Sequence, residues 1–225
     1  MQTPTRQDYH LLKKTCAGKT PQNGPGLPRR PGYNHPMSSK RIVLAVTGAS
    51  GMPYAVTLAR EISKNPELEL HLILSEAAKQ VLTLESDVQA DELAAIATAA
   101  YSQHDLAAGP ASGSWRHAGM IVCPCSMASL AAIANGLGSN LIHRAADVTL
   151  KEGRKLVLVP REAPFNEIHL RNLLAAKQAG AAIMPACPGF YSRPQTIEDL
   201  TDFVAARALD LLDIPHGLGK RWKDG

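Results

Sequence analysis

Short, mostly aliphatic runs alternate with longer segments of helical periodicity along most of this chain. The runs cover residues 42–46, 70–74, 120–123, 156–159 and 181–184. Continuous apolar runs of this length are typical of strands buried on both faces of a parallel sheet. The pattern therefore predicts five parallel strands.

Helical periodicity is clearest in two segments. Residues 54–64 place Ala55, Leu58 and Ile62 on one stripe, as in a helix that covers a sheet. A last helix follows Thr196 and ends before Pro215. Strands that alternate with helices predict the α/β class, with a doubly wound, mostly parallel sheet in a single Rossmann-like domain.

The domain is expected to cover residues 40–215, followed by a short tail over residues 216–225. Residues 1–39 contain six of the 16 prolines and no apolar periodicity, so we expect a disordered N-terminal extension there. The net charge of +4 divides into +7 over residues 1–41 and −3 over the remainder. By composition, the domain is therefore not a polyanion-binding surface.

No apolar run is long enough to cross a bilayer, and no secretory signal is visible. We therefore expect a cytoplasmic protein. The four cysteines are Cys16, Cys123, Cys125 and Cys187, and only one pair is closely spaced. Because no second pair supplies the remaining zinc ligands, we expect reduced thiols and no metal.

In open α/β sheets, ligands bind beyond the carboxyl ends of the strands. The first strand is followed by Thr47-Gly48-Ala49-Ser50-Gly51, a turn of small residues whose N–H groups could hold phosphate or let a planar ring approach the backbone. The turn lacks the G-x-G-x-x-G spacing of dinucleotide-binding folds. The plain alternative is a tight turn with Ser50 as the helix N-cap.

Further candidates follow the other strands. Ser75 comes after the second run, and Ser126 and Ser129 come after the third, where a helix entrance could bind an anion. Together with the turn after the first strand, the entrance at Ser126 makes two such sites, which suggests a mononucleotide. Arg161 and Glu162 follow the fourth run, and a simple salt bridge between them is the alternative.

Phosphate-binding chemistry also occurs away from the strand ends. Ser112-Gly113-Ser114 forms a small polar turn, and Arg144, Lys151 and Arg207 are cations that could hold a phosphate if the fold brings them together. For Arg207 alone, a solvated helix face is the alternative. His143 and His169 are expected to be structural.

The chain resembles the UbiX flavin prenyltransferases from about residue 40 to residue 222. The motifs that carry the resemblance are Thr47-Gly48-Ala49-Ser50-Gly51, Ala111-Ser112-Gly113-Ser114, Cys123-Pro124-Cys125-Ser126, and the runs 144–152, 156–164, 188–191 and 194–196. It departs from the family's usual pattern at Gly153, where relatives usually have Arg, and at Leu106, where some relatives have an aromatic residue.

The resemblance implies three sets of site residues. FMN would be bound by Gly48, Ala49, Ser50, Ser75, Ser126, Met127, Ala128, Ser129 and Arg161. Dimethylallyl phosphate would be bound by Ser112, Arg144, Lys151, Glu162, Tyr191 and Arg207, with Glu85 as a further member. The catalytic set would be Glu162, Lys151, Tyr191, Arg207 and Ser50.

The resemblance also implies the reaction and the partners. A dimethylallyl group would pass from dimethylallyl phosphate to N5 and C6 of reduced FMN, giving prenylated FMN for a UbiD-type decarboxylase. Trimers would assemble into a dodecamer, with active sites between subunits. Two alternatives stay open: an FMN-dependent cysteine decarboxylase of the same fold, and a non-catalytic flavin carrier.

Overall fold

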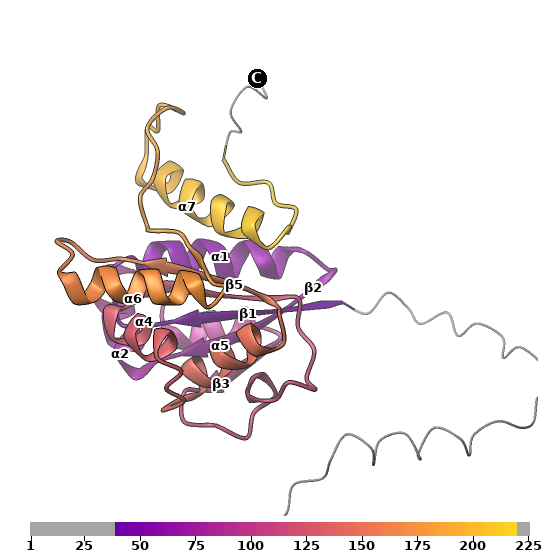
Figure 1. Ribbon diagram of the computed structural model, residues 1–225. Helices are drawn as coiled ribbons and strands as arrows, with labels where there is room; N and C mark the ends of the chain where they lie inside the picture. Colours follow the sequence, from indigo (N-terminus) through magenta and orange to yellow (C-terminus); the bar gives the residue numbers. More distant parts are fainter. Residues whose placement is uncertain (1–38, 220–225) are drawn as a thin grey trace, which may run out of the picture. The chain divides into compact units, whose positions relative to one another are not determined.

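A six-stranded sheet lies between two layers of helices in the computed structural model, which describes residues 39–219 (Figure 1). The strands are β1 (Lys40–Val46), β2 (Leu68–Leu74), β3 (Ala99–Ser102), β4 (Gly119–Cys125), β5 (Lys155–Pro160) and β6 (Ala182–Ile183). Their order is β3-β2-β1-β4-β5-β6, and every neighbouring pair is parallel. The order reverses between β1 and β4, the point at which such sheets bind ligands. The predicted doubly wound fold is confirmed.

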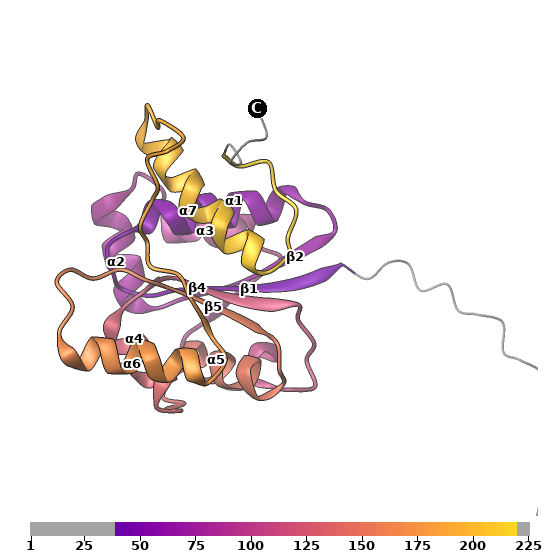
Figure 2. The ribbon, with the colours of Figure 1, turned by 45° about the horizontal axis from the view of Figure 1, so that its top comes forward.

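Helices cover both faces of this sheet (Figure 2). They are α1 (Met52–Lys64), α2 (Glu76–Glu85), α3 (Ala90–Ile96), α4 (Met127–Ala134), α5 (Leu141–Lys151), α6 (Glu167–Gln178) and α7 (Ile197–Leu211), with a short 3-10 helix η2 (Gly109–Ala111). The first three helices and α7 pack on one face, whereas α4, α5 and α6 pack on the other.

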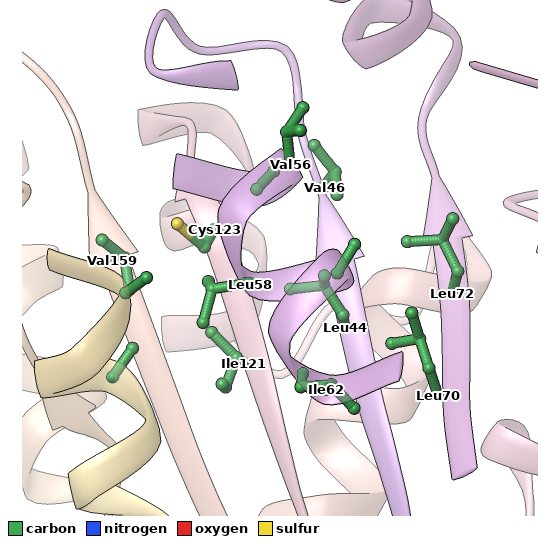
Figure 3. Packing of buried hydrophobic residues seen from close by; sticks show 14 of the residues in the cluster. Leu44, Val46, Val56, Leu58, Ile62, Leu70, Leu72, Ile121, Cys123 and Val159 are labelled. Carbon is green, nitrogen blue, oxygen red and sulfur yellow. The ribbon is translucent and has the colours of Figure 1, made fainter. Parts of the chain in front are cut away.

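The core forms two apolar layers because side chains alternate along each strand. In β1, Leu44 and Val46 belong to the layer under α1 and α7, whereas Val43 and Ala45 belong to the opposite layer. Figure 3 shows the first layer, where Leu58 of α1 packs over the sheet and is fully buried. Burying a side chain of this size contributes roughly 1.5–3 kcal/mol.

The clearest differences from the predicted elements are at β3 and β4. The edge strand β3 was not predicted, because its four residues alternate between half-buried and exposed and contain no aliphatic run. Strand β4 extends to Cys125, two residues beyond its predicted end, and carries Pro124 within it. Its register against β5 is irregular between Val122 and Cys125, as expected where proline removes a ladder N–H.

The described residues, 39–219, all belong to one compact unit. The expected disordered extension and tail lie outside the described residues, except for residue 39 and residues 216–219. No helix within residues 39–219 is long and apolar enough to cross a membrane. The same residues contain no group of three or more His, Cys, Asp or Glu side chains that could hold a metal ion.

His117, just before β4, is expected to make the stability of the fold depend on pH. It is 7% exposed, and its Nδ1 lies 3.2 Å from the carbonyl oxygen of Gly119, which can only accept. Burial lowers the pKa of His117 from 6.5 to about 4, with a smaller contribution from the charge of Arg154. Below pH 6.5 the unfolded chain therefore binds a proton at His117, whereas the folded state does not bind it until the pH approaches about 4.

We expect the His117 contribution to the free energy of unfolding to fall by about 1 kcal/mol between about pH 7 and about pH 5, after allowance for solvent screening. Urea unfolding at the two pH values measures this change. His117→Gln keeps a hydrogen-bonding side chain but cannot titrate, so it should reduce the pH dependence. An unchanged pH dependence in this variant would show that another group is responsible.

Candidate active site

The turn between β1 and α1 is closed by a carboxylate. Gly51 holds the N-cap position of α1 with φ 118° and has no side chain of its own to cap the helix; the alternative that Ser50 is the N-cap is therefore wrong. The N–H groups of Gly51 and Met52 instead donate to Oε2 of Glu85, at 2.8 and 3.0 Å. These two N–H groups are engaged by the protein itself and are not available to a phosphate; the approach of a planar ring to this turn stays a prediction.

Glu85 is held in its charged form. Burial acts to raise the pKa of Glu85, but hydrogen bonds from Ser50, Met52 and Gly51 and the charge of Arg161 outweigh it, so the pKa lies below its usual value. Glu85 is the last residue of α2, so the carboxylate joins the end of one helix to the start of another. From the sequence, Glu85 was predicted only as a further member of the dimethylallyl phosphate site.

Thr47 joins the ends of the two central strands and was not predicted as a site residue. Its hydroxyl donates to the carbonyl oxygen of Pro124 at 2.8 Å and accepts from the N–H group of Ser126 at 2.7 Å. The side chain is 1% exposed. The signal in the sequence that could have identified Thr47 is a hydroxyl residue directly after a buried strand. Thr47 thus fixes the first turn relative to the start of α4.

The helix entrance after β4 carries two hydroxyl groups. Ser126 is the N-cap of α4, and its hydroxyl accepts from the N–H group of Ser129 at 3.2 Å. Helix geometry leaves the N–H groups of Met127 and Ala128 without an acceptor inside the helix. These N–H groups and the positive end of the helix dipole suit an anion.

Ser75 lies at the neighbouring strand end and caps α2. Its hydroxyl accepts from the N–H group of Ala78 at 3.0 Å, and the residue is 9% exposed. Gly48, in the first turn, lies against the start of the same helix: a Cβ at Gly48 would be 2.4 Å from Cβ of Ala77. The first turn and the start of α2 are therefore in close contact.

Arg161 connects the end of β5 to the first turn. Its Nε donates to the carbonyl oxygen of Ser50 at 3.0 Å, and its N–H group lies 3.4 Å from the carbonyl oxygen of Cys125. Glu162 follows at the same strand end and is half-buried. Within residues 39–219 no salt bridge joins Arg161 to Glu162, so that alternative is not observed.

We call this whole set of strand-end residues the carboxyl-edge crevice: residues 47–51, Ser75, Glu85, residues 126–129, Arg161 and Glu162.

The two close cysteines are buried beside the crevice. Burial raises the pKa of Cys125 to about 12 and raises that of Cys123 as well, so both stay as neutral thiols. Cys187 is exposed, and Cys16 lies outside the described residues. His143 is also buried: its Nδ1 lies 2.8 Å from the hydroxyl of Ser139, and burial lowers its pKa, in line with a structural role.

A second group of predicted residues gathers around the turn over residues 112–114. Nζ of Lys151 lies 2.6 Å from Oε1 of Glu152, and a Cβ at Gly113 would be 2.9 Å from the same Nζ. Nε of Arg144 donates to the carbonyl oxygen of Ala111 at 3.3 Å. The fold thus brings Ser112, Arg144 and Lys151 together, which spacing alone did not show. We call them, with Gly113 and Ser114, the phosphate turn.

The phosphate turn does not adjoin the carboxyl-edge crevice of the same chain. Lys151 ends α5 just before β5 starts at Lys155, and Lys155 pairs with Gly119 at the start of β4. Lys151 therefore lies near the amino edge of the parallel sheet, whereas the crevice lies at the carboxyl edge.

Tyr191 and Arg207 lie in a third part of the structure, beside Phe203 of α7. The ring of Tyr191 packs edge-on against Phe203 of α7, with centroids 5.6 Å apart. Arg207 lies on α7, paired with Asp210 at 2.5 Å, and lines a cavity of about 370 Å³ together with Met184 and other residues of the β6 region. Helix α7 covers the face of the sheet opposite α5 (Figure 2). Within one chain, Arg207 and Lys151 therefore lie on opposite faces of the sheet.

Residues 32–209 match the family described as Flavoprotein. The flavin prenyltransferase LpdB of Lactiplantibacillus plantarum is 47% identical over 184 residues, which cover 82% of this chain and 98% of that protein.

Two solved structures share the fold at similar identity. A dodecameric FMN-dependent UbiX-like decarboxylase from Escherichia coli O157:H7 has a TM-score of 0.80 and 45% identity, over 81% of this chain and 99% of that chain. AnUbiX (PadA1), in complex with FMN and dimethylallyl pyrophosphate, has a TM-score of 0.80 and 44% identity, over 83% of this chain and 99% of that chain.

Proposed function

This chain belongs to the flavoprotein family and, within it, to the UbiX-type flavin prenyltransferases, and from that premise we propose that it transfers a dimethylallyl group from dimethylallyl phosphate to reduced FMN. The observation that carries the proposal is the phosphate turn, because the fold gathers Ser112, Arg144 and Lys151 around one position. A protein that only carried flavin would have no use for a second anion site.

The carboxyl-edge crevice supports FMN as the flavin. Two hydroxyl groups and the start of α4 offer donors for its phosphate, and Arg161 adds a guanidinium at the adjoining strand end. The turn at Gly48, Ala49 and Ser50 presents little side-chain bulk to the ring system. Reduced FMN would supply the nucleophilic N5, which bonds C1 of the prenyl group, and C6, which closes the new ring.

The residues of the chain would act mainly on the leaving group. Lys151, Arg144 and Arg207 would hold the phosphate and neutralise the charge that develops as the allylic C–O bond breaks, with the hydroxyl groups of Tyr191 and Ser112 as further donors. Fixed donors of this kind each contribute roughly 10²–10³ in rate. Glu162 would move protons at the crevice, close to Arg161.

We infer that neighbouring subunits complete each site. The phosphate turn and Arg207 lie on opposite faces of the sheet, and the turn also lies at the edge away from the crevice, so they meet only if different chains bring them together. Phe165, Ile168 and Leu174 on and before α6 are 38%, 67% and 58% exposed, which suits burial against other chains. A dodecamer built from trimers would provide such contacts, as the dodecameric relative suggests.

The decisive experiment is anaerobic incubation of the protein with reduced FMN and dimethylallyl phosphate, followed by mass spectrometry of the released flavin. We expect a flavin that is heavier by one five-carbon prenyl group. Unmodified FMN released from folded, flavin-loaded protein would favour the carrier, and oxidation of a cysteine-ended peptide in a parallel reaction would favour the cysteine decarboxylase. We further propose that a cytoplasmic UbiD-type decarboxylase receives the product.

A further inference from the structure

Arg154 binds the backbone of the phosphate turn at two points. It follows α5 by three residues, and its Nη2 donates to the carbonyl oxygen of Gly113 at 2.6 Å. Its Nη1 donates to the carbonyl oxygen of Trp115 at 3.1 Å. The planar guanidinium suits this task because its N–H groups have fixed directions, so two carbonyl groups can be held in one geometry.

Arginines hold three alternate carbonyl groups along this segment. Arg144 binds the carbonyl oxygen of Ala111, and Arg154 binds those of Gly113 and Trp115. The intervening hydroxyl groups of Ser112 and Ser114 lie 2.9 Å apart on an exposed surface. A carbonyl oxygen repels an anion whereas a hydroxyl group can donate to it, so tethering the carbonyl groups favours a turn that accepts phosphate.

The turn also sets the position of the Lys151 ammonium. A Cβ at Gly113 would lie 2.3 Å from Oε1 of Glu152 and 2.9 Å from Nζ of Lys151. The backbone of Gly113 is therefore in contact with this ion pair. Movement of the turn by about 1 Å would displace the ammonium, a displacement large enough to affect substrate positioning.

We propose that Arg154 is a positioning residue for the donor phosphate: by clamping the carbonyl groups of Gly113 and Trp115, it keeps the hydroxyl groups of Ser112 and Ser114 and the ammonium of Lys151 directed at one anion. The inference rests on the proposed function, since it concerns the donor of the same reaction. Arg154 itself is not assigned a contact with the substrate.

The test compares Arg154→Met and Arg154→Lys with Arg116→Met. Arg116 lies in the same segment, and its exposed guanidinium makes no hydrogen bond to any residue within 39–219. Two quantities are measured on the FMN-loaded protein: KM for dimethylallyl phosphate, and Kd for the same compound by titration calorimetry. The affinity for FMN and the melting temperature are measured in parallel.

For Arg154→Met we expect KM and Kd for the donor to rise at least about tenfold, with FMN affinity unchanged and kcat reduced less than about threefold. Arg154→Lys should show a smaller rise, because one ammonium cannot hold both carbonyl groups in the same way, and Arg116→Met should match the wild type. If Arg154→Met does not fold, Arg154→Lys decides by the same measurements.

Wild-type donor affinity in both Arg154 variants would overturn the inference. It would also be overturned if FMN affinity fell as much as donor affinity and the melting temperature fell with it, because that pattern indicates a general structural defect. Failure of the proposed function gives a different result, in which wild-type protein binds the donor but forms no prenylated flavin; calorimetry then still decides the role of Arg154. Wild-type protein that binds no donor would overturn both.

Discussion

Replacement of Gly48 by alanine is expected to weaken FMN binding roughly 10- to 100-fold, equivalent to about 1.4–2.8 kcal/mol. The added Cβ would lie 2.4 Å from Cβ of Ala77 and 3.1 Å from its backbone carbonyl carbon. Neither atom belongs to a flexible side chain, so the first turn and the start of α2 must move apart. Overpacking of this kind also costs about 1–3 kcal/mol of stability. Quenching of flavin fluorescence measures the affinity, and urea unfolding measures the stability.

Gly138→Ala is the matched control for this variant. It makes the same chemical change at a glycine with no atom within 4 Å of the added Cβ, so FMN affinity and stability should stay at the wild-type values. If Gly48→Ala bound FMN as tightly as the wild type, the turn after β1 would not form part of the flavin site, and the crevice would have to be placed elsewhere.

Lys151→Met and Arg207→Ala are each expected to lower prenyl transfer at least about 100-fold while FMN stays bound, because each removes a fixed cation from the departing phosphate. Assemblies that contain both variants should regain activity. Since the two residues lie on opposite faces of the sheet in one chain, a mixed assembly can form sites that take an intact Lys151 from one subunit and an intact Arg207 from another. With random mixing, up to about a quarter of the sites would be complete.

The experiment uses co-expressed variants that carry different affinity tags, purified through both tags in succession. A second mixture, of Lys151→Met with Arg144→Ala, provides the control. Both of these residues lie on α5 beside the same turn, so one chain supplies both to any site and no mixture restores them. Equal recovery in the two mixtures, or recovery in neither, would contradict the shared-site arrangement.

Much of the fold could be predicted because the signals were local. Continuous aliphatic runs indicated buried parallel strands, and Thr196 marked the start of α7, where it is the N-cap. Strand β3 escaped prediction because an edge strand that is half exposed needs no aliphatic run. The predicted end of β4 was wrong because the aliphatic run stops at Cys123, whereas the strand continues past Pro124 with an irregular register.

The candidate site was only partly predictable for a related reason. Ser75 follows an aliphatic run directly and Ser126 lies three residues after one, so both could be placed at helix starts from the sequence. Glu85 reaches Gly51 across 34 positions, and Arg154 reaches Gly113 across 41 positions; neither contact has a local signature. The separation of Lys151 from Arg207 depends on which face of the sheet each helix covers, and strand order rather than residue type decides that.

The division of the cationic residues between the two faces of the sheet has a consequence for how the protein would behave at low concentration. If a complete donor site exists only where two protomers touch, turnover depends on the concentration of the assembled protein. Dilution below the dissociation constant of the assembly would then abolish turnover while each protomer stays folded. Specific activity would then rise with protein concentration until assembly saturates. A substitution at a distant contact surface could abolish turnover without touching any residue that binds substrate.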